Sequence, residues 1–544
     1  MNTAVSSLNP EFKKLLSKYV EDFIVRVTSG STSQVPIALD PAFSLACKGL
    51  NIWFKTSFGH GSLAEIPWLA CFAPGQSAQL EGVYPVLLYQ RVTNIASVSY
   101  GVSATAVESM GAWPREWPTR MTAKLSKFPL KKYKQSFVLK EFSGQLQPQT
   151  AEIVSALLRV ISEFIELKEA QANRPKIDSS TLAEFASGSS DAGLTFSDQV
   201  TSRFFSSLLT KRFCILTGLA GSGKTKLAEA FAMWLCESDQ QYRIVAVGAD
   251  WTSNENLLGY ADALQSGQYR APVNGALELL LRAAADTDKK PYFLILDEMN
   301  LSHVERYFAD FLSAMESDNA PLSLHGVAAG LALDGTGAAK VPAKLALPSN
   351  LFIIGTVNVD ETTYMFSPKV LDRANVIEFR ATADQMDAFL DSPTGVDLKA
   401  LKAQGVPFAT AFVQRALADA DMAALTDDAG NALGPQFKSD LLAVFAALAS
   451  VGAEFGFRTA KEIARFMVIH KELSGDGWDY KDALDAQVLQ KLMPKLHGSA
   501  RKLSGVLKAL EEFATVRSLS LTLEKVKRMQ QRLERDGFTS FAEA

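Results

Sequence analysis

The sequence predicts an α/β protein built around a parallel β-sheet, because short apolar runs alternate with helical patterns through its middle part. The runs read RFCILTG, YRIVAVG, YFLILDE and LFIIGTVN, and all lie between residues 200 and 380. A continuous apolar run of this length is typical of a strand that helices cover on both faces. A glycine-rich segment follows the first run and two acids end the third, so polar groups are expected at the carboxyl ends of the strands.

Length and composition place the chain among globular proteins. Its 544 residues are enough for about two to four domains, and its hydrophobic content of 47% and charged content of 21% are ordinary. No apolar run reaches the roughly 20 residues of a membrane span, and the start lacks the charged-then-apolar order of a secretion signal. The net charge of −4 gives no overall attraction to nucleic acid, so any such affinity is expected to be local.

The cysteines predict a reducing compartment. They are scattered and form no CxxC pair: Cys47, Cys71, Cys214 and Cys236. This spacing argues against a structural zinc site or a disulfide framework. We therefore expect a cytoplasmic protein without a membrane segment.

Changes in composition predict four segments along the chain. Residues 1–168 mix short β-like runs with helical ends, which indicates an α+β domain. Residues 169–195 are poor in large apolar side chains and rich in Ser, Ala and Asp, which indicates a linker. Residues 196–382 hold the alternation of strands and helices. Residues 383–544 are rich in Ala and Leu and lack strand-like runs, which predicts a helical region.

The segment GLAGSGKT at 218–225 matches the phosphate-loop pattern G-x-x-x-x-G-K-[ST] in full, between a predicted strand and an amphipathic helix. Its glycines let backbone N–H groups approach phosphate oxygens where side chains would collide. Lys224 is expected to pair with the β- and γ-phosphates, and Thr225 to hold Mg²⁺. A chance glycine-rich turn is the alternative, and the flanking strand and helix disfavour it. The predicted nucleotide-binding residues are Gly218, Gly221, Ser222, Gly223, Lys224 and Thr225.

The run YFLILDEMN at 292–300 delivers two acids to the carboxyl end of a buried strand. Asp297 is expected to join Thr225 in the Mg²⁺ shell, and Glu298 to orient or deprotonate an attacking water. The alternative is an acidic N-cap for the next helix.

A third strand ends on Asn358, in the stretch IGTVNVDETTYMF at 354–366. Taken alone, the stretch is typical of a polar turn. In a parallel sheet, however, Asn358 emerges beside Asp297 and Glu298, where an amide can bond water or γ-phosphate without adding charge. Glu361, three residues further, is expected to help position Asn358, the water or a neighbouring subunit.

Arg373 follows a helix that begins with proline, in the segment SPKVLDRANVIEF. We expect it at the edge of the domain, able to reach a neighbour's nucleotide. A phosphate loop, an acid pair, a sensor asparagine and an arginine finger together form the layout of an AAA+ domain.

Several longer segments resemble the motor of McrB-type proteins: LLTKRFCILTGLAGSGKTKLA, DWTSNENLLGY, LDEMNLSHVERYFADFLSAME and GTVNVDETTYMFSPKVLDRANVIEF. Independently, FGHGSLAEIPWLACFAP followed by GVYPVLLYQ resembles the amino-terminal domain that is fused to such motors. The resemblance spans most of the chain. It implies an α/β AAA+ P-loop NTPase core with a parallel sheet and a helical lid, preceded by an α+β N-terminal domain.

McrB-type proteins are the nucleotide-driven subunits of modification-dependent restriction systems. The resemblance implies GTP rather than ATP as the substrate, Mg²⁺ as the cofactor, a homo-hexameric ring and a separate McrC-like nuclease subunit. It also implies that residues 1–168 read a modified cytosine in double-stranded DNA, which requires flipping the base out. The family's motif is an Asn, two spacers and an Asp-Arg pair. Here Asn358 is present, but Glu361-Thr362 replaces Asp-Arg.

Two further features concern nucleotide and DNA. Arg458, in FGFRTAKEIARFMVIH at 455–470, is similar to a second-sensor arginine that contacts the γ-phosphate; a solvated helix start is the alternative. The stretch at 112–137 interleaves basic and aromatic residues, which could neutralise phosphates and stack on bases. An amphipathic surface with core aromatics is the alternative. The candidate DNA contacts are Arg115, Arg120, Lys124, Lys127, Lys131, Lys132 and Lys134.

The sequence carries no PD…(D/E)xK arrangement, and its five histidines lack metal-ligand spacing, so the chain itself is not expected to cut DNA. The leading hypothesis is a motor and specificity subunit of a DNA-defence system. One alternative is an ATP-driven remodelling chaperone whose first domain binds protein. Another is a binding module with an inactive NTPase, against which the intact Lys224, Asp297, Glu298 and Asn358 argue.

Overall fold

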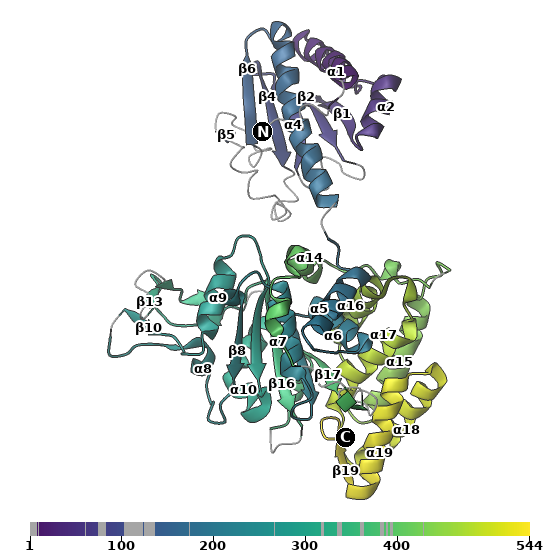
Figure 1. Cartoon of the computed structure of the whole chain (residues 1–544). Helices are drawn as coiled ribbons and strands as arrows, with labels where there is room; N and C mark the ends of the chain where they lie inside the picture. Colours follow the sequence, from purple (N-terminus) through teal and green to yellow (C-terminus); the bar gives the residue numbers. More distant parts are fainter. Residues whose placement is uncertain are drawn as a thin grey trace. The chain divides into compact units, whose positions relative to one another are not determined.

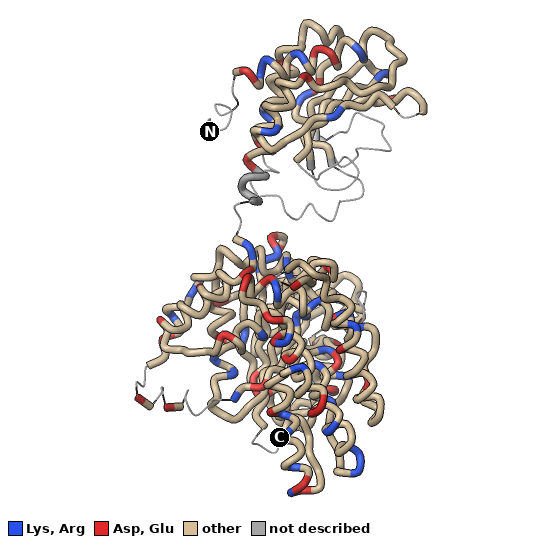
Figure 2. The backbone as a smooth tube through the Cα atoms, turned by 90° about the vertical axis from the view of Figure 1, so that its right-hand side faces the viewer, with Lys and Arg blue, Asp and Glu red and all other residues tan. Residues whose placement is uncertain are grey.

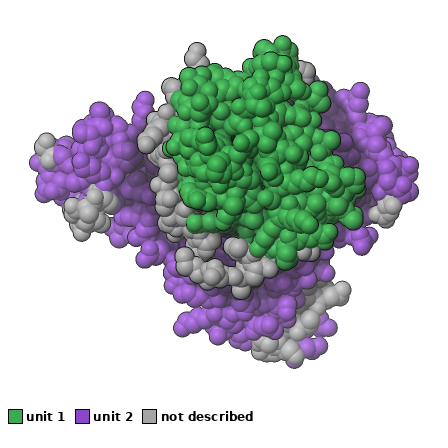
Figure 3. All heavy atoms as spheres, turned by 90° about the horizontal axis from the view of Figure 1, so that it is seen from above, with its two compact units in different colours: residues 1–174 green, residues 175–544 purple. Residues whose placement is uncertain are grey.

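The chain forms two compact units, residues 1–174 and 175–544 (Figure 3). The computed structural model describes residues 8–544 except for 9, 60, 74–82, 103–122, 125–136, 173–174, 266, 317–319, 334–339, 360–363, 381–385, 388–389, 392–394 and 428. Charged residues of both signs are interspersed along the backbone of each unit (Figure 2), in keeping with the small net charge of −4. None of the described helices combines the length and apolar content that a membrane crossing requires.

Unit 1 is an antiparallel sheet with helices against one face (Figure 1). The strands lie in the order β1 (Trp53–Gly59), β2 (Leu63–Phe72), β3 (Val83–Gln90), β4 (Ile95–Val102), β6 (Phe137–Ser143) and β5 (Ala123–Lys124). The helices are α1 (Pro10–Thr28), α2 (Pro41–Gly49) and α4 (Thr150–Ala172). Because side chains alternate along a strand, β2 places Leu69 and Cys71 in the core shared with the helices. Ala70 and Phe72 belong to a second cluster, on the opposite face.

Unit 2 is built on a fully parallel five-stranded sheet. Its strand order is β17 (Asn375–Phe379), β7 (Phe213–Gly218), β16 (Leu351–Asn358), β11 (Tyr292–Asp297) and β8 (Tyr242–Ala246). The four apolar runs thus form strands as predicted, and β17 is an additional edge strand. Strand β16 lies between β7 and β11, so the ends of these three strands are neighbours.

Helices cover both faces of this sheet. Along β7, Phe213 and Ile215 join one core cluster, while Cys214 and Leu216 join the other. The helices before β17 are α5 (Ser179–Asp191), α6 (Asp198–Thr210), α7 (Lys224–Leu235), α8 (Glu255–Leu258), α9 (Ala276–Ala285), α10 (Val304–Tyr307), α11 (Ala309–Glu316) and α12 (Pro368–Leu371). Short strands form two further sheets: β9 (Tyr260–Ala261), β10 (Gln268–Arg270), β13 (Leu331–Leu333) and β14 (Lys340–Val341), and β12 (Leu322–Ser323) with β15 (Lys344–Leu345).

The C-terminal region is mainly helical, as predicted, and packs against the same cores. Its helices are α14 (Val406–Leu417), α15 (Gly434–Ala449), α16 (Phe457–Ser474), α17 (Tyr480–Gln487), a π-helix (Val488–Leu492), α18 (Ala500–Arg517) and α19 (Ser520–Asp536). It also contains one antiparallel strand pair, β18 (His497–Ser499) with β19 (Phe538–Ser540).

The segment 169–195 is not a continuous linker, which corrects the prediction. Helix α4 continues to Ala172, and α5 occupies Ser179–Asp191 with Asp178 as its N-cap. Although the segment has few large apolar residues, Phe185 of α5 is fully buried against Trp234 of α7, with ring centroids 5.4 Å apart. Phe185, together with Leu182, therefore packs α5 onto the core.

Helix α6, which precedes β7, is fixed to α16 by a buried histidine. The Nε2 atom of His470 lies 3.2 Å from the hydroxyl of Ser202, and its Nδ1 lies 3.3 Å from that of Ser474. Burial, followed by the nearby charge of Arg203, lowers the pKa of His470 from 6.5 to about 4. The folded protein therefore keeps this imidazole neutral, whereas the unfolded chain protonates it below about pH 6.5.

We expect acidification to destabilise the protein through His470. Since the folded-state pKa is the lower one, the free energy of unfolding should fall between about pH 6.5 and pH 4, by about 2 kcal/mol from pH 7 to pH 5. Chemical denaturation at both pH values measures this loss. The His470→Gln variant, which cannot protonate, should lose about 2 kcal/mol less over the same range. An equal loss in the variant and the wild type would contradict the assignment.

Candidate functional site

The phosphate loop joins β7 to α7, and its glycines are required by backbone geometry. Gly218 has φ 154°, and a Cβ there would lie 2.4 Å from the carbonyl oxygen of Phe379. Gly221 and Gly223 have φ of 73° and 94°, in the region that favours glycine. Gly223 is the N-cap of α7, which begins at Lys224. The loop therefore leads directly into a helix N-terminus, where backbone N–H groups and the helix dipole favour an anion.

Lys224 lies inside this loop and is only 4% exposed. Its Nζ donates to the carbonyl oxygens of Gly218 at 3.0 Å and Leu219 at 2.6 Å, and lies 3.4 Å from the hydroxyl of Ser222. A buried ammonium that uses backbone acceptors of the loop is placed where phosphate oxygens would bind.

Asp297, at the end of β11, connects the phosphate loop to the neighbouring strand. Its Oδ1 accepts from the Thr225 hydroxyl at 2.7 Å and from the Thr356 hydroxyl at 2.6 Å. Thr356 in turn accepts from the backbone N–H of Glu298 at 3.1 Å. Thr356 was not predicted as a site residue. The signal was available, since it is the polar residue two places before Asn358 and so shares its face of β16.

Glu298 has a left-handed backbone, φ 54°, which is uncommon for a residue other than glycine. Such conformations persist where surrounding bonds fix them, and they concentrate at functional sites. Here the N–H is bound by Thr356, and the carbonyl accepts from Leu301 at 2.9 Å. The side chain meets the predicted sensor, because Nδ2 of Asn358 donates to Oε1 of Glu298 at 3.2 Å.

These groups line one cavity of about 320 Å³. Its walls are residues 220–226 of the loop together with Asp297, Glu298 and Asn358. The structure thus brings together the phosphate loop, the acid pair and the asparagine. The sequence predicted them to be neighbours because parallel strands end at one edge of the sheet. A cavity with a lysine, a hydroxyl, two carboxylates and an amide can hold a triphosphate and a water molecule in line with it.

The oxygen donors at this cavity fit a magnesium ion. The Thr225 hydroxyl and the Asp297 carboxylate are hard ligands of the type Mg²⁺ prefers. Among the described residues no group of three or more His, Cys, Asp or Glu could hold a metal, so phosphate and water would supply most of its ligands. Bound there, the ion would neutralise charge on the β- and γ-phosphates.

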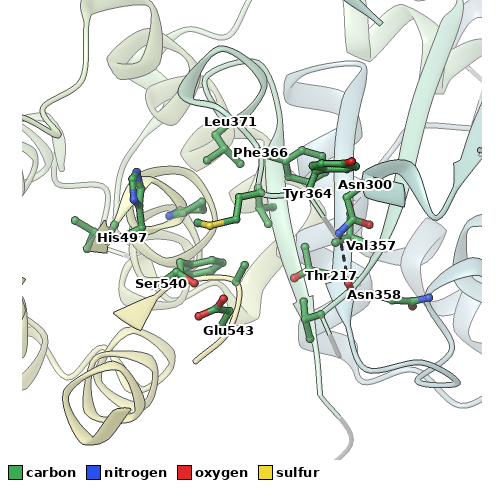
Figure 4. Close-up of a pocket in the computed structure, with 17 residues that line it drawn as sticks. Thr217, Asn300, Val357, Asn358, Tyr364, Phe366, Leu371, His497, Ser540 and Glu543 are labelled. Carbon is green, nitrogen blue, oxygen red and sulfur yellow. Dashed lines mark hydrogen bonds between the residues drawn. The ribbon is translucent and has the colours of Figure 1, made fainter. Parts of the chain in front are cut away.

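Asn300 bonds the backbone of Asn358 and is another residue that the sequence prediction missed. Its Nδ2 donates to the backbone carbonyl oxygen of Asn358 at 3.4 Å, and its own backbone carbonyl oxygen accepts from the N–H of Tyr364 at 3.0 Å. Figure 4 shows the bond between Asn300 and Asn358 beside a second cavity, of about 100 Å³. Residues of the core strands line one side of that cavity, and the C-terminal residues His497, Ser540 and Glu543 line the other.

Arg373 is buried in the single chain, so its predicted reach to a neighbour's nucleotide stays a prediction. It is 7% exposed, and its Nε donates to the carbonyl oxygen of Leu312 at 2.9 Å. The other guanidinium nitrogens bond the carbonyl oxygen of Lys369 and the carboxylate of Glu316. The side chain turns inward because three acceptors of its own chain surround it.

Arg458 lies outside the lining of the phosphate-loop cavity, and its role as a second sensor stays a prediction. It stands in the first turn of α16 and lies 3.4 Å from Glu316, the carboxylate that also binds Arg373. The two predicted arginines thus share one counter-ion on α11.

The remaining predicted residues fall on parts that are not described. Glu361 lies within 360–363, and Lys124 belongs to β5, of which only the backbone is described. The other candidate DNA contacts also lie outside the described residues: Arg115, Arg120, Lys127, Lys131, Lys132 and Lys134.

Comparison with known proteins finds similarity over the region that forms this site. Residues 208–331 match the family described as AAA domain, and residues 412–538 match a domain of unknown function, DUF8727. The chain is also 24% identical, over 317 residues, to the "Type IV methyl-directed restriction enzyme EcoKMcrB subunit" of Escherichia coli strain K12. Residues 208–331 thus form an AAA domain, and the chain is similar to an McrB subunit.

The similarity to the Escherichia coli protein covers 57% of this chain and 66% of its relative, just under two thirds of the relative's length. Among solved structures, the Hsp104–ADP complex of Saccharomyces cerevisiae is 17% identical with a TM-score of 0.26. That match covers 46% of this chain and 48% of the other.

Substitutions at the site should separate nucleotide binding from hydrolysis. Lys224→Ala should abolish binding, whereas Glu298→Gln should bind nucleotide and not turn it over. Thr356→Val removes the hydroxyl that fixes both acids, so we expect kcat to fall about 10- to 100-fold, with binding changed less than about threefold. Binding of a fluorescent nucleotide and steady-state phosphate release measure the two effects.

Thr356→Ser, which keeps the hydroxyl, is the matched control and should retain most of the activity. Hydrolysis by Glu298→Gln at the wild-type rate would show that Glu298 does not act on the water.

Proposed function

We propose that this protein is the motor and specificity subunit of a modification-dependent restriction system, hydrolysing GTP in preference to ATP. The observation that carries the proposal is the hydrogen-bonded arrangement of Lys224, Thr225, Asp297, Glu298 and Asn358, found in a chain similar to a "methyl-directed restriction enzyme" subunit. The chain provides no nuclease motif, so a separate McrC-like subunit would cut the DNA.

In this proposal each residue of the cavity has one task. Lys224 and the loop N–H groups bind the β- and γ-phosphates, while Thr225 and Asp297 hold Mg²⁺. Glu298 accepts the proton of the attacking water, and Asn358 orients that water through its amide. Thr356 and Asn300 are positioning residues, since they bind the backbone and side chains of these groups rather than the substrate.

Unit 1 is proposed to recognise modified double-stranded DNA. The sheet face opposite α1 and α4 carries a cluster of rings, in which Phe72 lies 5.0 Å from Trp53 and 5.0 Å from Tyr84, centroid to centroid. Trp68 packs edge-on against the same ring at 6.4 Å. Both tryptophans are only partly buried, which suits stacking on a base. The basic residues between 115 and 134 remain the predicted phosphate contacts.

Arg373 is proposed to act on the nucleotide of the neighbouring subunit in a homo-hexameric ring. In the single chain its guanidinium is bound by Leu312, Lys369 and Glu316, so the proposal requires the turn that carries Arg373 to shift on assembly. Arg458, which shares Glu316 with Arg373, is proposed to contact the γ-phosphate as a second sensor. Glu361 is proposed to help position Asn358.

A remodelling chaperone is the second candidate function, since the same hydrolytic core can drive protein unfolding. The ring cluster on the sheet of unit 1 favours the DNA-directed function, because aromatic side chains can stack on any base, whatever the DNA sequence.

A four-way comparison tests the proposed function. Hydrolysis of GTP and of ATP is measured side by side, with and without a duplex that contains 5-methylcytosine. We expect GTP to be hydrolysed faster and the methylated duplex to bind more tightly than the unmodified one. A clear ATP preference without DNA binding would favour the chaperone.

The fragment Pro175–Ala544 serves as the control for the role of unit 1. Each unit has its own hydrophobic clusters, so the fragment is expected to fold and to keep its NTPase activity. It should lose binding to methylated duplex. Equal binding by the fragment and the full chain would assign DNA recognition to unit 2 instead.

Mixing two inactive variants tests whether Arg373 acts across a subunit boundary. Arg373→Ala should bind nucleotide and lose about 10³-fold in hydrolysis, as arginine fingers elsewhere do. Asn358→Ala should also be inactive, but only in its own site. In mixed rings, Asn358→Ala subunits lend Arg373 to neighbours with an intact Asn358, so partial activity should return. No recovery in rings shown to be mixed would place Arg373 within its own subunit.

A further inference from the structure

The turn Asp372–Ala374, between α12 and β17, carries Arg373. Lysines that lie outside the strands of the sheet bond the residues on either side of Arg373. Within the turn, the Arg373 N–H bonds the carbonyl oxygen of Val370 at 3.0 Å. The carbonyl oxygens of Asp372 and Ala374, on either side of Arg373, accept from the C-terminal region instead. The position of Arg373 therefore depends on residues far along the chain.

Lys491 supplies both of these bonds. Its Nζ donates to the carbonyl oxygens of Asp372 and Ala374, each at 3.0 Å, and its side chain is 1% exposed. Glu462 of α16 neutralises the ammonium from 2.9 Å. A buried charge is stable only when it is fully bonded in this way, so Lys491 fixes the turn in one geometry.

Two more lysines complete this contact from different elements. Lys211, at the junction of α6 and β7, pairs with Glu462 and reaches the carbonyl oxygen of Asp372 at 3.5 Å. Lys495 pairs with the side chain of Asp372. The turn thus meets both the strand that leads into the phosphate loop and the C-terminal helices.

The backbone around Lys491 is irregular at this point. Residues Val488–Leu492 form a π-helix and are all buried. Single π-turns are rare and frequently occur at functional sites. Its residue Gln490 donates to the hydroxyl of Ser207 on α6 at 3.2 Å. The π-helix therefore bonds the helix that precedes the phosphate loop and, one residue on, the turn of Arg373.

We infer that Lys491 is a positioning residue that couples the C-terminal region, 412–538, to Arg373. A shift of α6 or α16 on nucleotide binding moves the π-helix, and Lys491 passes this shift to the carbonyl groups on both sides of Arg373. The inference rests on the proposed NTPase function and assigns a task to the region that matches a domain of unknown function.

Hydrogen exchange of the full chain tests the coupling directly. The probe is the β,γ-imido analogue of GTP, or of ATP if that nucleotide binds better. In the wild type the analogue should protect residues 218–226 and change exchange in residues 370–376. In Lys491→Met, which keeps the side-chain length without the charge, protection of 218–226 should remain while the change in 370–376 is lost. An unaltered change in 370–376 would overturn the inference.

Two more variants keep this test decisive. Lys525→Met is the matched control. Lys525 is also a lysine of the C-terminal region whose side chain is 1% exposed, and it forms an ion pair with Glu378 of β17. It should respond as the wild type does. If Lys491→Met does not fold, Glu462→Gln removes the counter-ion of Lys491 by a smaller change and should weaken the response of 370–376 at least twofold. A full response in Glu462→Gln would then overturn the inference.

A double-mutant cycle with Arg373→Ala asks whether Lys491 acts through Arg373. We expect Lys491→Met to lower kcat at least tenfold, and the double variant to be no more than twofold below Arg373→Ala. Lys525→Met should instead combine with Arg373→Ala by simple multiplication. A further tenfold loss in the double variant would show that Lys491 acts elsewhere.

The two proposals fail in different ways. If Arg373→Ala hydrolyses at the wild-type rate, the proposed role of Arg373 falls, and the exchange experiment alone decides the coupling. If Arg373→Ala is inactive but Lys491→Met leaves exchange in 370–376 unaltered, the coupling falls and the role of Arg373 stands.

Discussion

One carboxylate oxygen holds the hydrolytic site together. Oδ1 of Asp297 accepts from the hydroxyls of Thr225 and Thr356, which belong to the first turn of α7 and to β16. The same Thr356 hydroxyl accepts a hydrogen bond from the backbone N–H of Glu298, a residue with a left-handed backbone conformation. These hydrogen bonds fix the positions of the phosphate loop, the acid pair and the sensor strand relative to one another. The bonded groups are partly buried, and hydrogen bonds are stronger where water is excluded.

That arrangement depends on the register of the parallel sheet. β16 pairs with β7 on one side and with β11 on the other, so that Asn358 lies opposite Gly218 and Gly355 opposite Leu296. The three strands end at nearly the same level, and a slip of one residue would turn Thr356 and Asn358 to the other face. Side chains of these strands pack into an apolar cluster on each face of the sheet, and a slip would exchange them between the two clusters.

The two arginines that the sequence singled out do not line the phosphate-loop cavity in the single chain. Arg373 and Arg458 share Glu316, and the turn of Arg373 is bound by lysines of the core and the C-terminal helices. The single chain supplies the phosphate loop, the two acids and Asn358 to the cavity, whereas the arginines are bound by other partners. The C-terminal region does not form a separate body, since its helices share core clusters with the sheet.

The sequence alone determined the sheet, the phosphate loop and the polar strand ends, since each is a local pattern: an apolar run, a glycine motif or an acid after a strand. It also indicated that Asn358 would meet Glu298, because parallel strands end at one edge. It did not reveal Thr356 and Asn300, whose importance lies in which atoms they bond. It did not reveal that Arg373 and Arg458 share Glu316, and it treated 179–191 as linker although Phe185 docks that helix. Only the tertiary structure decided these points, because a charged or aromatic side chain takes the partners that folding brings near it, and those partners come from distant parts of the chain.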